Sequence, residues 1–327
     1  MQNAFHNSNI LVTGGLGFIG SNLAIKLVEL GASVTVVDCL VEHHGGNLFN
    51  VEPVKGDLDI NFTDMRDAAA FAPLVKNRDY IFHLAGQVSH GDSMRDPQLD
   101  LGVNCISTMN LVEACRELNP EARLVYTSTR QVYGVPKKLP VDEQHPVMPI
   151  DVNGINKLAA EYYHYLYHRT YELPSTILRL TNTYGPRQQI RNDRQGFAGI
   201  FIRKALKQEG IQIFGDGKQR RDFNHVDDVV DALLRAASTP ACFGEIYNLG
   251  NQPHSLLDFV DCLRALTDVA FEAIPFPHSK KIIDIGDYYG SYDKFRQATG
   301  WQPAIDLQQG LGNTLDYYRQ FPQHYWT

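Results

Sequence analysis

Hydrophobic and polar positions follow a repeating order through the first 180 residues, where short β-branched runs alternate with longer stretches of helical periodicity. The β-branched runs are bounded by Gly or Asp and predict strands at Asn9–Val12, Ser33–Asp38, Tyr80–Leu84, Leu124–Ser128 and Thr176–Leu180. The periodic stretches predict helices at Ile19–Leu30, Gly102–Leu118 and Asn153–Tyr171. This alternation is typical of βαβ units, so we expect an α/β fold built on a parallel sheet.

The third predicted helix carries a broad apolar face. Two rows of side chains at i, i+4 spacing form it: Leu158, Tyr162 and Leu166, and Ala159, Tyr163 and Tyr167. Such a stripe is wider than one packing partner requires. It indicates either a helix–helix interface in a homodimer or burial beneath a second domain.

The chain changes character after Leu180, where Gly, Pro, Asn, Gln and Arg become frequent and apolar runs become short. This composition is typical of a smaller, loop-rich unit that binds substrate. We therefore predict two domains, residues 1–180 and 181–327, with some later segments able to return to the first domain.

Composition and charge narrow the class of protein. The chain has 327 residues, 43% hydrophobic and 20% charged, as globular proteins do. Its 30 basic and 37 acidic residues give a net charge of −7, which argues against a nucleic-acid track. No apolar run reaches the roughly 18 residues that a membrane span needs. Five cysteines without a CxxC pair, and an N-terminus without a signal peptide, predict a soluble cytoplasmic protein with no metal site.

One basic segment is hidden in this acidic total. Between Arg187 and Arg221 there are nine Lys or Arg against three Asp or Glu. Net charge does not report local charge, so a focused site for an anionic small molecule is compatible with the composition.

The clearest motif is the glycine-rich segment TGGLGFIG near the N-terminus. Its spaced glycines are Gly14, Gly17 and Gly20, and Phe18 and Ile19 open the helix that follows. Glycine is needed where the backbone turns sharply and approaches a pyrophosphate, which the helix N-terminus then holds. A second β-branched run ends at Asp38, whose carboxylate suits ribose hydroxyls and repels a 2′-phosphate. The segment predicts an NAD site in a Rossmann-type doubly wound sheet.

This segment and further motifs resemble the extended short-chain dehydrogenase/reductase family, which includes the NAD-dependent sugar-nucleotide epimerases and dehydratases. The further motifs are GDL at Asp57, HLAGQ at His83–Gln87, Asn104, TSTRQVYG at Thr127–Gly134, GINKLAAE at Gly154–Glu161, LRLTNTYGPRQ at Leu178–Gln188 and RRDFNHVDDVV at Arg220–Val230. The resemblance spans nearly the whole chain. It implies a homodimer that binds NAD and a nucleoside diphosphate sugar, most simply a UDP-sugar.

The resemblance also implies particular cofactor contacts. Asp57 and Leu58 would flank the adenine. Ala85 and Gly86 would pass beneath the nicotinamide half, and the Lys157 ammonium would reach the nicotinamide ribose. The further cofactor contacts that the resemblance implies are Leu84, Gln87, Asn104 and Thr127.

In this family a Ser or Thr, a Tyr and a Lys four residues after the Tyr carry out catalysis, with the Tyr as general base. The resemblance assigns Thr129 to the hydroxyl position and Lys157 to the lysine, which leaves Asn153 where the tyrosine belongs. An amide is neither an acid nor a base near neutral pH. Three explanations stand open. In the first, another residue is the base, and the candidates are Lys157, His90, Tyr133 and Tyr184. In the second, the reaction starts at another sugar position, where a substrate group or water acts as the base. In the third, the protein binds NAD and sugar nucleotide without turnover, or the asparagine is an introduced substitution.

The residues after Thr129 bear on the reaction class. In 4,6-dehydratases an Asp-Glu pair follows the threonine, whereas Arg130 and Gln131 stand here. The resemblance therefore favours an epimerase, with dehydration or decarboxylation through the same keto intermediate as the nearest alternative. HLAGQV and DRQGFAGIF are also similar to the CDP-tyvelose 2-epimerase branch, which leaves the oxidised carbon open.

On the substrate side, Asn182 and Arg221 match residues that bind the diphosphate in relatives. Gln87, Thr129 and Arg130 complete the substrate set that the resemblance implies. Asp284 stands where relatives carry an arginine, beside Lys280 and Lys281. His164 and His168, at i and i+4, have no third metal ligand nearby and are expected at the surface or an interface.

Overall fold

The computed structural model describes residues 2–42, 44–192, 196–276 and 285–326. The strands are β1 (Asn9–Thr13), β2 (Ser33–Val37), β3 (Leu58–Asn61), β4 (Tyr80–His83), β5 (Arg123–Thr129), β6 (Ser175–Leu180), β7 (Asn182–Tyr184), β8 (Ile211–Phe214), β9 (Arg220–His225), β10 (Ile246–Asn248), β11 (Pro253–Ser255) and β12 (Phe271–Ile274). The α-helices are α1 (Gln2–Phe5), α2 (Phe18–Glu29), α3 (Ala68–Phe71), α4 (His90–Arg95), α5 (Pro97–Leu101), α6 (Ser107–Leu118), α7 (Val152–Tyr171), α8 (Phe197–Leu206), α9 (Val226–Ser238), α10 (Leu256–Thr267), α12 (Asp293–Thr299), α13 (Leu307–Gln320) and α14 (Pro322–Tyr325). The remaining helical turns are η1 (Leu48–Asp57), η2 (Ala72–Val75), η3 (Gly102–Ile106), η4 (Arg130–Tyr133) and η5 (Pro240–Cys242).

Seven parallel strands form the central sheet, in the order β10-β6-β5-β4-β1-β2-β3. The predicted Rossmann-type α/β fold is confirmed, and all five predicted strands belong to this sheet. Sequence reasoning missed β3 and β10, the two edge strands, because they are only four and three residues long and contain polar residues. β10 comes from the second half of the chain and pairs with β6.

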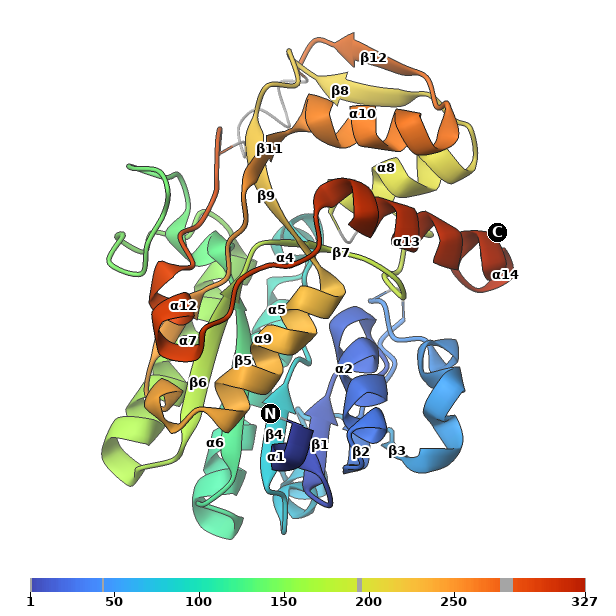
Figure 1. Cartoon of the computed structure of the whole chain (residues 1–327). Coiled ribbons are helices and arrows are strands. Elements are labelled where there is room, and N and C mark those ends of the chain that lie inside the picture. Colours follow the sequence, from blue (N-terminus) through green and yellow to red (C-terminus); the bar gives the residue numbers. More distant parts are fainter. Residues whose placement is uncertain (1, 43, 193–195, 277–284, 327) are drawn as a thin grey trace.

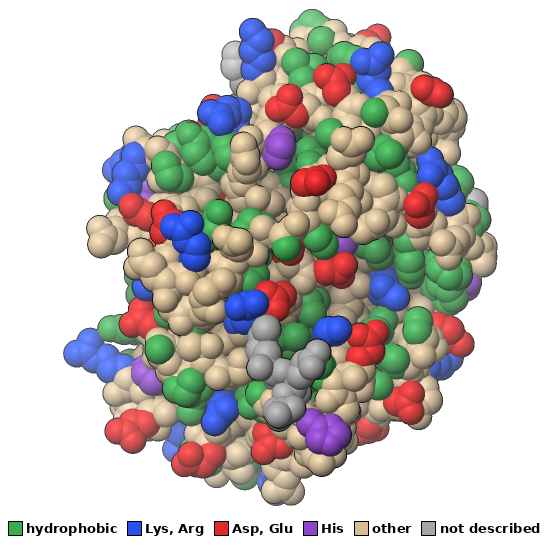
Figure 2. Space-filling view, viewed as in Figure 1, with side chains coloured by type: hydrophobic (Ala, Val, Ile, Leu, Met, Phe, Trp, Pro, Cys, Tyr) green, Lys and Arg blue, Asp and Glu red, His purple; other side chains and the backbone are tan. Residues whose placement is uncertain are grey.

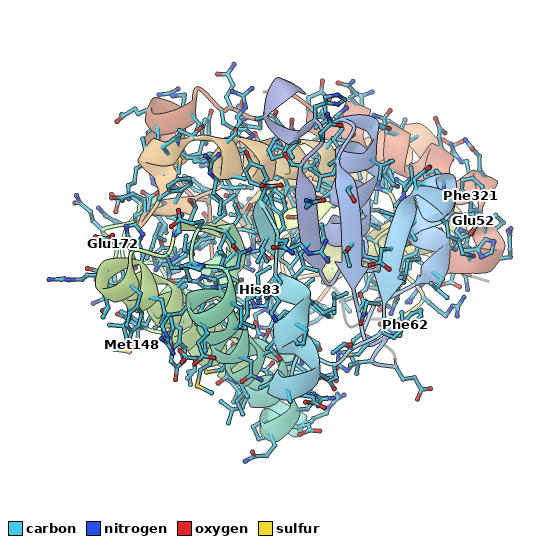
Figure 3. All side chains as sticks on the ribbon, turned by 90° about the horizontal axis from the view of Figure 1, so that it is seen from below. Glu52, Phe62, His83, Met148, Glu172 and Phe321 are labelled. Carbon is cyan, nitrogen blue, oxygen red and sulfur yellow. The ribbon has the colours of Figure 1, made fainter. Side chains whose placement is uncertain are left out.

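Helices cover both faces of the sheet, as Figures 1 and 3 show. Alternate strand residues face opposite sides: Ile10 and Val12 pack in a core with α2 and α9, whereas Leu11 packs in a second core with α6. Because both faces are buried, the strands are almost continuously apolar. Their carboxyl ends therefore stay in fixed positions, and the loops that follow them carry the functional side chains.

Helix α7 packs against α6, β5 and β6 of the central sheet. Burial beneath a second domain is not found for Tyr162 and Leu166, whereas Leu158 of the same face packs against the cluster that contains Tyr288. Tyr162 is 59% and Leu166 is 51% exposed. Glu172 marks the end of this helix at the edge of the molecule in Figure 3.

The second half of the chain builds most of a further unit above the carboxyl ends of the strands (Figure 1). It contains the three-stranded sheet β11-β9-β7 and the pair β12-β8. Side chains of α8, α10 and α13 form its core, in which Phe201, Phe259 and Leu311 are buried. α9 instead packs on α2 of the first unit, so the chain crosses between the two units more than once.

Two sequence-based expectations concern the surface and the cysteines. No helix among the described residues has the length and apolar character to cross a membrane. Acidic and basic side chains are interspersed on the face shown in Figure 2. The five cysteines are free thiols; Cys115 and Cys242 are buried, whereas Cys39 is exposed.

Candidate active site

A cavity of about 520 Å³ lies at the carboxyl ends of the parallel strands, the usual ligand position in such sheets. Its walls come from the glycine loop, the ends of β2, β4, β5 and β6, and the first turns of α7 and α8. The lining residues predicted from the sequence are Gly14, Gly17, Phe18, Ile19, Gly20, Asp38, Leu84, Ala85, Gly86, Gln87, Thr127, Thr129, Arg130, Asn153, Lys157 and Asn182. Folding thus brings most of the predicted cofactor and substrate residues to one cavity.

The glycine loop has no room for side chains. Gly14 has φ +68°, and a Cβ there would lie 2.7 Å from the Ala85 nitrogen. A Cβ at Gly20 would collide with the Gly14 carbonyl oxygen. Helix α2 begins at Phe18 with no side-chain cap, so its first amides are available to an anion in the cavity. This geometry fits the pyrophosphate of a dinucleotide.

Asp38 directly follows β2 and lies at the cavity wall. Its carboxylate accepts hydrogen bonds from Leu16 N at 3.2 Å and Leu40 N at 3.0 Å. Burial raises the pKa of this carboxyl, while the two amides act in the opposite direction. Two backbone donors therefore fix a carboxylate at the place where the adenosine ribose is expected.

The expectation for Asp57 and Leu58 is corrected by the structure. Leu58 is level with Val34 at the beginning of β2, so both residues lie at the amino end of the sheet, away from the cavity. Asp64 and Met65, which follow the carboxyl end of β3, line the cavity instead. The GDL match placed the adenine contact seven residues too early, because it treated the first residues of β3 as the residues that follow the strand. The polar turn after Asn61 was the sequence signal for the true end of β3.

Hydrogen bonds from a buried side chain hold the loop after β4 in place. Asn104 is buried, accepts from Gln87 N at 3.2 Å and donates to Gln87 O at 3.1 Å. It does not line the cavity, so its expected direct cofactor contact is replaced by support of the loop. The Gln87 side chain likewise donates to Ser89 O within its own loop.

Asn153 is 2% exposed, in the first turn of α7. Its Nδ2 donates to Gln87 O at 2.7 Å and to Asp100 Oδ2 at 3.1 Å. Asp100 is fully buried, and its other oxygen accepts from Asn156 Nδ2 at 2.7 Å. Both hydrogens of the Asn153 amide are thus occupied, and what it can offer a ligand is its oxygen, as an acceptor.

Lys157 lies one turn further along α7. Its ammonium donates to Thr127 O at 3.1 Å and lies 4.9 Å from the centre of the Tyr126 ring. Burial lowers the pKa of Lys157 to about 8, although Asp100 and Glu161 act to raise it. A Cβ on Gly86 would approach its Nζ to 2.9 Å, so glycine leaves space for the ammonium beneath the loop.

The candidate bases do not all reach the cavity. Tyr133 and Tyr184 are buried outside its wall. Burial raises the pKa of Tyr133 to about 12, and its hydroxyl donates to Asn248 Oδ1 at 2.8 Å. Of the four candidates, His90 and Lys157 line the cavity. Sequence position alone could not make this separation.

The threonine and its neighbours end β5. Thr129 Oγ1 accepts from Gln131 N at 3.3 Å and thereby caps the turn η4. The Arg130 guanidinium lies 5.1 Å from the centre of the Tyr288 ring. Thr129, Arg130 and Gln131 all line the cavity, which presents a hydroxyl, a cation and an amide to a ligand.

The two residues predicted to bind the substrate diphosphate, Asn182 and Arg221, lie in different places relative to the cavity. Asn182 lines the cavity and donates to Asp222 O at 2.9 Å. Arg221 is buried outside the wall, and its guanidinium donates to Arg220 O at 2.9 Å and to Gly286 O at 2.5 Å. The structure therefore corrects the placement of Arg221, because β9 directs its side chain to backbone carbonyls. Lys280, Lys281 and Asp284 lie outside the described residues.

The basic segment does not gather its charge at the cavity either. Its described members that line the wall are Gln188, Gly196, Phe197 and Ala198, none of which is basic. Arg203, for example, donates to Arg191 O on the outside of α8 at 2.8 Å.

His164 corrects another expectation, because it is fully buried and not at the surface. Its Nδ1 lies 2.7 Å from Ser175 Oγ, and its ring stacks on Tyr126 with centroids 4.8 Å apart. Within the described part of the chain, no three possible metal ligands come together.

Comparisons with known proteins agree with this geometry. The model of the NAD dependent epimerase/dehydratase family matches residues 10–250. A putative UDP-glucose 4-epimerase of Methanocaldococcus jannaschii is 34% identical over 95% of this chain and 98% of its own. UDP-glucuronic acid decarboxylase 1 of Xenopus tropicalis is 32% identical over 96% of this chain and 73% of its own. The crystal structure of the Thermotoga maritima UDP-glucose 4-epimerase with UDP-glucose superposes with a TM-score of 0.86 at 32% identity, covering 95% of this chain and 99% of that one.

Proposed function

Because the chain belongs to the NAD-dependent epimerase/dehydratase family, we propose that it epimerises a nucleoside diphosphate sugar through a transient keto intermediate. The observation that carries this proposal is one cavity whose wall contains the glycine loop at one end and Thr129, Asn153 and Lys157 at the other. A dinucleotide held on that loop and a sugar held beside Thr129 would share this single space.

The cofactor is NAD, for which the glycine loop and Asp38 form the fitting set of residues. NAD supplies a hydride acceptor for the oxidised sugar carbon and the hydride for its re-reduction. The chain's own residues do the rest. Thr129 orients the reacting oxygen, Asn153 accepts a hydrogen bond from a sugar hydroxyl, and the Lys157 cation stabilises negative charge on the oxygen.

Decarboxylation is the second candidate, and Arg130 favours it. A guanidinium in the cavity wall, in place of the Asp-Glu pair of 4,6-dehydratases, suits a sugar that carries a carboxylate. The similarity to a UDP-glucuronic acid decarboxylase agrees with this candidate. A uronate oxidised next to its carboxylate-bearing carbon becomes a β-keto acid, which loses CO₂.

We also propose that two copies associate through the outer faces of α6 and α7. Met109 is 37% and Ile155 is 54% exposed there, in addition to Tyr162 and Leu166. The two helices pack side by side on the same face of the central sheet. Exposed apolar surface of this kind is a usual site of protein association.

The test is a substrate panel followed by ¹H NMR, with NAD present. UDP-glucose, UDP-galactose, UDP-N-acetylglucosamine and UDP-glucuronate are each incubated with the protein. An epimeric sugar supports the epimerase, whereas a pentose product with CO₂ identifies the decarboxylase. The proposal fails if UDP-, GDP-, CDP- and dTDP-sugars all remain unchanged although NAD binds.

A further inference from the structure

We infer that His90, held by Asp151, is the group that takes and returns the proton of the reacting sugar hydroxyl. This inference rests on the proposed function and names the residue that replaces the family's tyrosine. His90 opens α4 on the cavity wall, and its side chain is 45% exposed. It is therefore reachable by a bound sugar.

Asp151 determines which ring nitrogen carries the hydrogen. One carboxylate oxygen accepts from Gly154 N at 2.7 Å and caps α7, and the other contacts His90 Nδ1. A carboxylate accepts only, so Nδ1 is the nitrogen that donates to Asp151, and in the neutral ring the lone pair is then on Nε2. The pairing of an imidazole with a carboxylate behind it is the arrangement by which His acts as a base in hydrolytic enzymes.

Gln131 supports the same tautomer from the other side. Its Nε2 amide nitrogen lies 2.6 Å from His90 Nε2, and an amide nitrogen can only donate. Gln131 Oε1 is buried without a partner among the described residues. The Gln131 amide can therefore leave His90 without breaking a hydrogen bond at its oxygen. A sugar hydroxyl is an equivalent donor, and it would take the place of the amide at Nε2.

The same loop connects His90 to the catalytic position of the family. Gln87 O accepts from Asn153, and three residues later His90 contacts Asp151, so both ends of this short loop are fixed to the first turn of α7. Asn153 can hold a hydroxyl through its oxygen but cannot take the proton. His90 supplies, from the adjacent loop, the basic nitrogen that Asn153 lacks.

Lys157 is the competing candidate, and its position is less suitable. Lys157 is 6% exposed. Its ammonium donates to Thr127 O and lies beneath Gly86. With a pKa of about 8, it is mainly a cation at neutral pH and has no lone pair to accept a proton. Lys157 supplies positive charge to the site, whereas the His90 side chain is 45% exposed and reachable.

The step balances. The hydroxyl O–H bond breaks and its proton forms the Nε2–H bond, the hydride of the same carbon goes to NAD⁺, and the C–O bond becomes a carbonyl. Re-reduction returns the hydride to the opposite face and the proton from Nε2 to the oxygen. The imidazolium formed between these steps is stabilised by Asp151. Arg130, on η4, is a further charge that acts on Asp151, and α4 itself carries Asp92 and Arg95, which pair with each other.

The test compares His90→Gln and Asp151→Asn with the matched control His6→Gln, an exposed histidine near the amino end of β1. In Asp151→Asn the amide oxygen still caps α7, but the amide nitrogen donates to His90 Nδ1. The tautomer then inverts and Nε2 becomes a donor. We expect at least a hundredfold loss of kcat in both variants, with KM changed less than threefold, and no loss in the control.

Two readouts separate this role from a structural one. ¹⁵N NMR of histidine-labelled protein without substrate should show the Nδ1–H tautomer for His90 in the wild type and the Nε2–H tautomer in Asp151→Asn. Added imidazole should restore turnover to His90→Ala. If wild type turns over a sugar nucleotide and His90→Gln keeps kcat within threefold, this inference is overturned while the proposed function stands. If wild type converts no sugar nucleotide, the proposed function itself fails.

Discussion

Asn153 donates a 3.1 Å hydrogen bond to Asp100, a carboxylate with no exposed surface. The other Asp100 oxygen accepts from Asn156, so two amides from one helical turn donate to this buried side chain. The asparagine is therefore integrated into the first turn of α7 and does not simply leave a gap where the family carries a tyrosine. This pairing gives the first prediction.

Asn153→Asp should destabilise the protein at neutral pH, because it places a second carboxylate against Asp100 in a buried site. We expect the free energy of unfolding to fall by about 3 kcal/mol or more at pH 7. The new carboxyl has a raised pKa in the folded state, so the loss develops as pH rises above its unfolded value near 4. Urea unfolding at pH 4.5 and pH 7, with the exposed Asn7→Asp as control, measures this difference. Equal losses at both pH values would contradict the repulsion.

Gly20→Ala should abolish dinucleotide binding, because its Cβ would collide with the Gly14 carbonyl oxygen. The control is Gly312→Ala within α13, where a Cβ meets nothing within 4 Å. Alanine there should stabilise the helix by roughly 0.5–1 kcal/mol. Calorimetric NAD titration and thermal unfolding of both variants test the pair. Normal NAD affinity in Gly20→Ala would show that the loop does not hold the cofactor closely.

Asp38→Asn should weaken the preference for NAD over NADP. The amide oxygen can still accept from a backbone amide, but the charge that repels a 2′-phosphate is removed. We expect the ratio of the two dissociation constants to change by about tenfold, as 1.4 kcal/mol of lost discrimination would give. Fluorescence titration with both cofactors measures it. A wild-type protein that binds NAD and NADP equally would remove the basis of this prediction.

Lys157→Met should change how stability depends on pH. Burial lowers the folded pKa of Lys157 from 10.5 to about 8, so between these values the unfolded chain holds more protons on this residue than the folded one. Wild-type stability then rises with pH in that window relative to the methionine variant, by about 3 kcal/mol. Urea unfolding of both proteins at pH 7.5 and pH 10 tests the sign. A constant difference would mean that Lys157 is not desolvated.

Leu166→Glu should produce a monomer if α6 and α7 form the subunit interface. A carboxylate in the middle of an apolar contact loses its hydration without gaining a partner. The control is Phe62→Glu, which changes an equally exposed apolar residue on the opposite side of the molecule (Figure 3). Light scattering after size exclusion gives the mass of each. A wild-type monomer would refute the proposed interface, as would a dimeric Leu166→Glu variant.

The sequence predicted those parts of the structure that local patterns determine. Glycine spacing and the acidic residue after β2 predicted residues that line the cavity, because both are consecutive features of one βαβ unit. Asp57 was misplaced because the register of a short polar strand is set by its neighbour β2 and not by its own pattern. Arg221 was misplaced because its partner Gly286 is 65 residues away. The contact between His90 and Asp151 joins the first residue of α4 to the N-cap of α7, two positions that nothing in the sequence connects.

The most direct test of the central claim follows one hydrogen atom. A UDP-sugar that carries deuterium on the carbon to be inverted is converted by the wild-type protein in ordinary water, and the product is analysed by ²H NMR and mass spectrometry. We expect the deuterium to be retained on the inverted carbon, because the hydride passes to bound NAD and returns to the same atom. Product in which that carbon carries hydrogen from water would contradict direct hydride return, and inversion would then proceed by proton exchange at that carbon.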